Sequence, residues 1–147
     1  MTSGKQKINK TPEVDSGYTS SIEIKVRDYE CDLQGVVNNA NYLHYLEHAR
    51  HEFLESKGIG FAELHREGTD LIVTKVEIEY KFSLRSLDKF VVKTAVMREG
   101  NVRLAFYQDI YRLPDEKLIA RAKVTGISSK NGRPVSPKPI LKKLGLE

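Results

Sequence analysis

The segment from Asp28 to Tyr42 holds the side chains in this chain that are best suited to chemistry on a carbonyl group. It contains a carboxylate, Asp32, followed by an Asn-Asn pair directly before a stretch with helical spacing. A carboxylate can attack a carbonyl carbon or activate a water molecule. Unpaired N–H groups at a helix N-terminus stabilise negative charge that develops on a carbonyl oxygen. The segment is therefore a candidate site for hydrolysis of an activated carbonyl compound.

A second pattern, within the expected helix, offers metal chemistry instead. His44-Tyr45-Leu46-Glu47-His48 has two histidines at i and i+4, a spacing that can bind zinc and would make the chain a zinc-dependent hydrolase. Such a site needs a third ligand, and the chain after residue 70 offers mainly strands. His44, His48 and His51 lie off the apolar stripe of the helix. We therefore expect them on its polar face, with no metal and no cofactor.

The single cysteine, Cys31, adds a third possibility, a thiolate nucleophile assisted by Asn39 and a histidine. Its acidic neighbours Asp28, Glu30 and Asp32 disfavour the thiolate, so we do not expect this chemistry. One cysteine can form neither an internal disulfide nor a multi-thiolate metal site, which fits a reducing compartment. The expected location is the cytoplasm.

The elements that must position this segment follow from the spacing of apolar residues. Alternation at Ile22, Ile24 and Val26 predicts a strand before it. An apolar stripe with a period near 3.6 predicts a long helix after it, ended by Gly58. A shorter helix is expected over 61–66. The stripe of the long helix consists of Tyr42, Tyr45, Leu46, Ala49, Phe53 and Leu54.

The rest of the chain reads as antiparallel strands joined by short turns. The first strand alternates a mainly apolar face with a charged face. Three more strands are expected over 90–98, 102–112 and 118–128. Three prolines after residue 133 predict that the last segment does not join the sheet. The expected face of the first strand is Ile72, Thr74, Val76, Ile78 and Tyr80. Residues 1–18 have no periodicity and are expected to be a flexible tail, leaving one domain over 19–147.

The order strand, long helix and four strands predicts an α+β fold in which an antiparallel sheet of about five strands wraps around one central helix. This is the layout of the hotdog fold. Asp32, two residues, Gly35-Val36-Val37 and four residues to Tyr42 also resemble the active-site signature of the 4-hydroxybenzoyl-CoA thioesterase branch of that fold. The Asn-Asn pair resembles plant acyl-carrier-protein thioesterases. The resemblance covers roughly residues 20–135, and only this segment carries a sharp motif.

The resemblance implies hydrolysis of acyl-CoA or acyl-carrier-protein thioesters. It puts the nucleophile or general base on Asp32 and the backbone N–H that polarises the thioester carbonyl on Asn39. In a bacterial acyl-CoA subgroup a histidine takes the place of Asn39, so water activation by an imidazole is excluded here. A non-catalytic acyl-binding protein of the same fold is the remaining alternative. The residues expected to bind substrate are Gly35, Val36, Val37, Asn38, Tyr42, Lys81, Arg85 and Lys130.

The bulk composition limits the possible partners. The net charge is +4 with a pI near 9.1, but 24 basic residues are scattered among 20 acidic ones, which does not indicate nucleic-acid binding. Cations near strand ends, Arg103 and Arg133 among them, fit a phosphorylated carrier better.

No apolar run approaches the roughly 20 residues needed to span a bilayer. An open sheet edge and a small core predict a homodimer or homotetramer.

Overall fold

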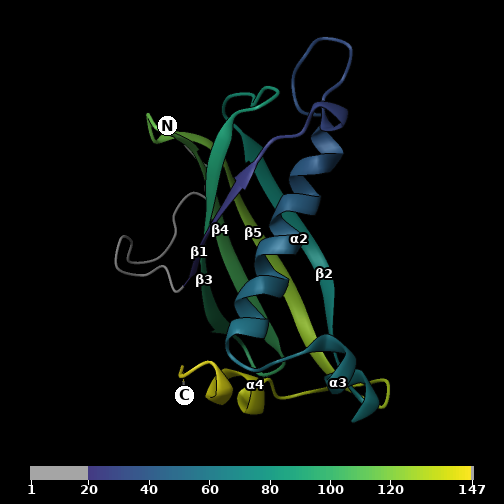
Figure 1. Ribbon diagram of the computed structural model, residues 1–147. Coiled ribbons are helices and arrows are strands. Elements are labelled where there is room, and N and C mark those ends of the chain that lie inside the picture. Colours follow the sequence, from purple (N-terminus) through teal and green to yellow (C-terminus); the bar gives the residue numbers. More distant parts are fainter. Residues whose placement is uncertain (1–19, 147) are drawn as a thin grey trace, which may run out of the picture.

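The computed structural model describes residues 20–146, and the expected N-terminal tail lies outside them. Five long strands form one antiparallel sheet in the order β1-β3-β4-β5-β2. The sheet curls around a single long helix, α2 (Figure 1), so the α+β hotdog layout is confirmed. The strands are β1 (Ser20–Lys25), β2 (Thr69–Tyr80), β3 (Lys89–Glu99), β4 (Arg103–Leu113) and β5 (Lys117–Lys130).

The long helix α2 (Asn39–Ser56) lies in the hollow of the sheet (Figure 1). Its buried residues are the predicted apolar stripe, from Tyr42 to Leu54. Gly58 follows the helix with a φ of +80°, a conformation that costs a glycine little. The second helix, α3 (Phe61–Arg66), has the predicted bounds. One face of α2 is therefore buried against the sheet and forms part of the hydrophobic core.

A bulge in β2 overturns the single apolar face predicted for this strand. Val73 pairs with Gly126 of β5 but Lys75 pairs with Thr125, so Thr74 is an extra residue. An extra residue reverses the side-chain alternation beyond it. Ile72 consequently points to the opposite face from Val76. Alternation alone cannot reveal a bulge, because both faces of this strand carry apolar residues.

The C-terminal segment was predicted not to join the sheet, and that prediction is wrong. A three-residue strand, β6 (Arg133–Val135), pairs with the end of β5 through a turn at Asn131 and Gly132, which both have positive φ. Pro134 is tolerated because β6 is a short edge strand. A final helix, α4 (Lys138–Lys143), follows it. Ile140, Leu141 and Leu144 close the core beneath the C-terminal half of α2.

None of the helices in residues 20–146 is long and apolar enough to cross a membrane.

The hydrophobic core divides into two clusters along α2. The first surrounds Tyr42 and Tyr45 near the start of the helix, and the second surrounds Phe53 and Leu54 near its end. The segment singled out from the sequence enters the fold above the first cluster.

Candidate active site

The residues from Asp28 to Asn39, here called the Asp32 loop, fold into a tight turn fixed by backbone hydrogen bonds. Asp32 N–H donates to the Val36 carbonyl at 2.9 Å, and Gly35 N–H donates to the Asp32 carbonyl at 2.9 Å. Gly35 has a φ of +82°, which disfavours any residue with a Cβ. The sequence pattern Asp-x-x-Gly is thus the pattern of this turn.

The Asp32 carboxylate is exposed and is held by one of its two oxygens. Its Oδ1 accepts the Gln34 N–H at 2.8 Å and the Val36 N–H at a longer 3.4 Å. Its Oδ2 accepts no hydrogen bond from residues 20–146. One oxygen therefore orients the carboxylate, while the other is available for a proton or an electrophile.

The N-terminus of α2 presents a free backbone donor. Asn38 is the N-cap residue, and its Oδ1 accepts the Ala40 N–H at 2.9 Å. Asn38 N–H donates to the Glu30 carbonyl at 2.9 Å. Between these two satisfied amides, the Asn39 N–H has no acceptor within the described part of the chain. An unpaired N–H at the positive end of an 18-residue helix is suited to bind an oxygen that gains negative charge.

Glu30 joins the Asp32 loop to α2, a role that the sequence pattern did not indicate. Its buried carboxylate accepts the Tyr45 hydroxyl at 2.7 Å and the Arg27 N–H at 2.9 Å. Its carbonyl also accepts the Asn41 side-chain amide at 2.8 Å. Burial raises the pKa of Tyr45, and the hydrogen bond to Glu30 raises it further, so the hydroxyl stays a donor. In the sequence Glu30 is one of several acidic residues around Cys31, and nothing in its spacing distinguishes it from the others.

The predicted substrate-binding residues Val36, Val37 and Tyr42 hold the Asp32 loop against a second loop, residues 81–88. The Tyr42 hydroxyl accepts the Leu84 N–H at 2.9 Å, and Val37 N–H donates to the Leu84 carbonyl at 2.9 Å. Val37 and Tyr42 are buried in the first core cluster. Their observed contacts stabilise the fold, and a contact of either side chain with substrate stays a prediction.

The cations predicted to bind a phosphorylated carrier lie at two ends of the sheet. Arg85 pairs with Val36 in an isolated bridge, and Lys81 directly follows β2, so both lie at the end that carries the Asp32 loop. Lys130 pairs with Thr69 at the far end of β2, which at 3.3 Å per residue is roughly 35 Å away. Arg103 and Arg133 share this far end. Of these five cations, one protomer places Lys81 and Arg85 at the end of the sheet that carries Asp32.

The competing constellations gain no support from the geometry. Within residues 20–146 the structure contains no group of three or more His, Cys, Asp or Glu side chains that could hold a metal ion. His44, His48 and His51 are exposed, as predicted from the helical stripe. Burial and the surrounding carboxylates raise the pKa of Cys31. Its thiolate is therefore disfavoured at neutral pH.

Comparison with known proteins assigns the chain and its fold to one family. The family model of the thioesterase-like superfamily matches residues 26–144. The acyl-acyl carrier protein thioesterase ATL2, chloroplastic, of Arabidopsis thaliana is 46% identical over 106 residues, which cover 72% of this chain and 56% of the relative. The long-chain acyl-CoA thioesterase FadM of Escherichia coli is 29% identical over 104 residues, 70% of this chain and 77% of the relative. The chain spans about half the length of the Arabidopsis relatives that it matches.

A crystal structure of a hypothetical protein from Aquifex aeolicus superposes with a TM-score of 0.79 at 31% identity, covering 85% of this chain and 98% of the other. The same score is reached at 18% identity by a 1,4-dihydroxy-2-naphthoyl-CoA thioesterase from Synechocystis, a likeness that concerns the fold alone. The family match begins directly after β1, runs through α4 and includes the whole of the Asp32 loop. This chain belongs to the thioesterase-like superfamily.

Proposed function

We propose that this protein hydrolyses acyl thioesters of coenzyme A or of an acyl carrier protein, with Asp32 as nucleophile or general base and the Asn39 N–H as the donor to the thioester carbonyl. The observation that carries the proposal is the free Asn39 N–H at the start of α2, with the Asp32 carboxylate held in the same loop. The names of relatives support both carriers, since ATL2 is an acyl-acyl carrier protein thioesterase and FadM a long-chain acyl-CoA thioesterase.

In the general-base form of the reaction, the free oxygen of Asp32 takes a proton from water while the water oxygen attacks the carbonyl carbon. Negative charge moves to the carbonyl oxygen and is stabilised by the Asn39 N–H and the helix dipole. The carbon–sulfur bond then breaks, and the thiolate leaves. Because a thiol has a pKa near 8.5, the thiolate is a good leaving group and can recover the proton from Asp32 or solvent. In the nucleophile form, an Asp32 oxygen attacks the carbonyl carbon and the thiolate leaves, which gives a mixed anhydride. Water then hydrolyses the anhydride, releasing the fatty acid and restoring the Asp32 carboxylate.

We expect lysine and arginine side chains near the Asp32 loop to bind coenzyme A or the acyl carrier protein. Lys81 and Arg85 share the end of the sheet with Asp32, which suits phosphate groups of coenzyme A or the acidic surface of a carrier protein. Lys130 lies at the other end of β2 and joins this role only if a second subunit brings it there. The cytoplasmic location expected from the single cysteine stays a prediction.

Such a second subunit belongs to the proposal. β2 is an edge strand of twelve residues, and several of its apolar side chains are 40% or more exposed: Ile72, Val73, Val76 and Tyr80. A long apolar edge strand is a template for pairing with another chain. Antiparallel pairing of β2 with the same strand of a second copy would lay the Lys130 end of one subunit beside the Asp32 end of the other. Sedimentation at micromolar concentration should therefore give a dimer or tetramer.

The test of the activity is hydrolysis of a panel of acyl-CoAs of different chain length and one acyl-carrier-protein thioester, at low and high salt. The proposal predicts turnover of at least one carrier-bound substrate and a KM that rises with salt, because screening weakens attraction to the cations. A short N-acetylcysteamine thioester, which lacks phosphates, should have a KM that salt leaves unchanged. Binding of these substrates without any hydrolysis would favour the acyl-binding alternative instead.

A further inference from the structure

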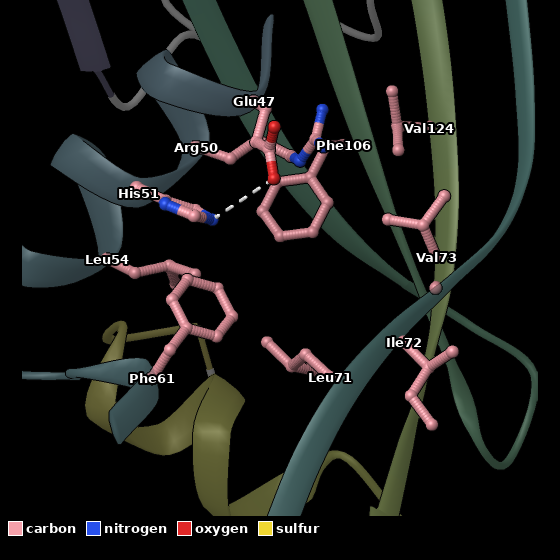
Figure 2. Close-up of a pocket in the computed structure, with 11 residues that line it drawn as sticks. Glu47, Arg50, His51, Leu54, Phe61, Leu71, Ile72, Val73, Phe106 and Val124 are labelled. Carbon is pink, nitrogen blue, oxygen red and sulfur yellow. Dashed lines mark ion pairs between the residues drawn. The ribbon is translucent and has the colours of Figure 1, made fainter. Parts of the chain in front are cut away.

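A second polar feature lies farther along α2, in a pocket of about 320 Å³ between this helix and β2 (Figure 2). The size is at the lower end for small-molecule sites and suits one acyl group rather than a whole coenzyme. The walls are mainly apolar, and the polar side chains are Glu47, Arg50 and His51 of α2. We call it the Arg50 pocket. Its apolar walls include Leu54, Phe61, Leu71, Val73, Phe106 and Val124.

Two residues of β4, Gln108 and Phe106, position the Arg50 side chain in this pocket. Its Nη1 donates to Gln108 Oε1 at 3.1 Å, and its guanidinium lies 5.9 Å from the centre of the Phe106 ring. The Gln108 amide is fully buried, and its Nε2 donates to the Leu46 carbonyl at 3.1 Å and to Thr94 Oγ1 at 3.2 Å. These acceptors determine which end of the amide faces Arg50. The guanidinium is therefore positioned by an amide whose own N–H donors are already used.

The hydrogen-bonding capacity of Arg50 is largely unused. A guanidinium has five N–H donors, and one of them has an acceptor within residues 20–146. Burial lowers the pKa of Arg50. Glu47, one turn earlier, acts in the opposite direction but forms no ion pair with Arg50. Glu47 instead approaches His51 at 3.9 Å on the rim (Figure 2). A charge facing an apolar pocket needs an acceptor from elsewhere once water is displaced.

We propose that the Arg50 pocket receives the acyl group of the substrate and that Arg50 donates hydrogen bonds to an oxygen carried by that group, whether hydroxyl, keto or carboxylate. This inference rests on the proposed thioester hydrolysis and specifies its substrate class. Arg50 lies eleven residues beyond Asn39 in α2, about 16 Å along the helix axis. The guanidinium is therefore too far from the Asn39 N–H to act on the same carbonyl and contacts the acyl part instead. A plain hydrocarbon chain would leave the Arg50 N–H groups without an acceptor, whereas an oxygen on the acyl group would accept hydrogen bonds from them.

The experiment compares matched acyl groups with and without an oxygen. The substrates are octanoyl-CoA and dodecanoyl-CoA, each beside its 3-hydroxy and its terminally hydroxylated form. Their thioether analogues, which cannot be hydrolysed, give dissociation constants by calorimetry independently of turnover. The wild-type protein should prefer at least one terminally hydroxylated form by about tenfold or more in kcat/KM and in affinity, the gain typical of a hydrogen bond to a charged group. The 3-hydroxy oxygen lies beside the carbonyl, out of reach of Arg50, and should give no such gain.

Arg50→Met should reduce this preference to about one. Arg50→Lys, which keeps the charge with a single donor centre, should keep part of it and guards against a folding defect in the first variant. Arg66→Gln removes an exposed cation from the end of α3, outside the pocket, and should keep the full preference. An equal preference in wild type and Arg50→Met, or none in wild type, would overturn the inference.

Two further outcomes distinguish recognition of an acyl oxygen from a contact between subunits and from a loss of hydrolysis. If Arg50→Met weakens self-association and leaves the preference unchanged, the partner of Arg50 is a carboxylate of a second subunit, and the inference is wrong. If no thioester is hydrolysed but the hydroxylated thioether analogues still bind more tightly, the proposed hydrolysis fails while the specificity of the pocket stands.

Discussion

The Asp32 loop and the Arg50 pocket lie at two levels of the same helix and hold their polar groups by different means. In the loop, backbone amides within a few residues of Asp32 fix the turn and orient the carboxylate. In the pocket, a single side chain from α2 is fixed by Gln108 of β4, 58 residues away in the chain. Local hydrogen bonds thus produce the candidate catalytic geometry, and long-range packing produces the candidate specificity.

The two regions also differ in the cost of their charges. Asp32 is exposed, so water and two backbone donors solvate it at little cost. Arg50 is half-buried against apolar walls, and burial disfavours its charge. Within residues 20–146, one of its five N–H donors has an acceptor. A change in the loop should therefore affect turnover without much loss of stability, while a change in the pocket should affect which substrate is preferred.

The largest expected effect is on turnover after Asp32→Asn. The amide oxygen can still accept the Gln34 N–H, so the turn and the melting temperature should persist. The base or nucleophile is lost, and kcat should fall by about 100-fold or more. Steady-state kinetics on the best acyl-CoA measures it. Glu52→Gln, which removes an exposed carboxylate of α2 outside the loop, should change kcat little; comparable turnover in wild type and Asp32→Asn would remove Asp32 from the mechanism.

A smaller effect, on stability, is expected for Glu30→Ala. The change leaves the buried Tyr45 hydroxyl and the Arg27 N–H without their acceptor. The free energy of unfolding should fall by about 1–3 kcal/mol, measured by urea denaturation. Glu23→Ala, at an exposed position of β1, is the matched control and should stay within about 0.5 kcal/mol. Equal losses in the two variants would mean that Glu30 does not anchor the loop to α2.

The smallest effect is expected for Gly35→Ala, which tests the turn itself. Nothing lies within 4 Å of a Cβ at this position, so the cost comes from the positive φ alone, about 1–2 kcal/mol. Gly60→Ala, in the same type of substitution but with a φ of −103°, should cost less. Thermal unfolding compares the two variants, and a Gly35→Ala protein as stable as Gly60→Ala would show that the turn is free to change.

Local patterns explain which parts of the molecule could be predicted. The stripe of α2 and the bounds of α3 follow from helical spacing, and the Asp32 loop is encoded in about fifteen consecutive residues. The Asn131-Gly132 turn that creates β6 also had a local signal, which the neighbouring prolines obscured.

Features that depend on distant pairing were not predictable in the same way. The bulge at Thr74 appears only in the register of β2 against β5. The Arg50 pocket combines side chains of α2, α3, β2, β4 and β5, so no segment carries its pattern. Arg50 itself reads in the sequence as one more residue of a polar helix face. Its role emerges only when Gln108 and Phe106 are placed against it.

The central claim, that the Asn39 N–H at the start of α2 polarises the thioester carbonyl, is tested most directly by comparing Asn39→Pro with Asn39→Ala. Proline removes the N–H but is well tolerated at the first position of a helix, and Asn38 already has the extended backbone that must precede it, with φ −65° and ψ 139°. Alanine removes only the side chain and keeps the donor. If the claim is correct, Asn39→Pro should lower kcat by about 100- to 1000-fold with the fold intact, and Asn39→Ala should keep most of the activity. Equal activity in the two variants would contradict it.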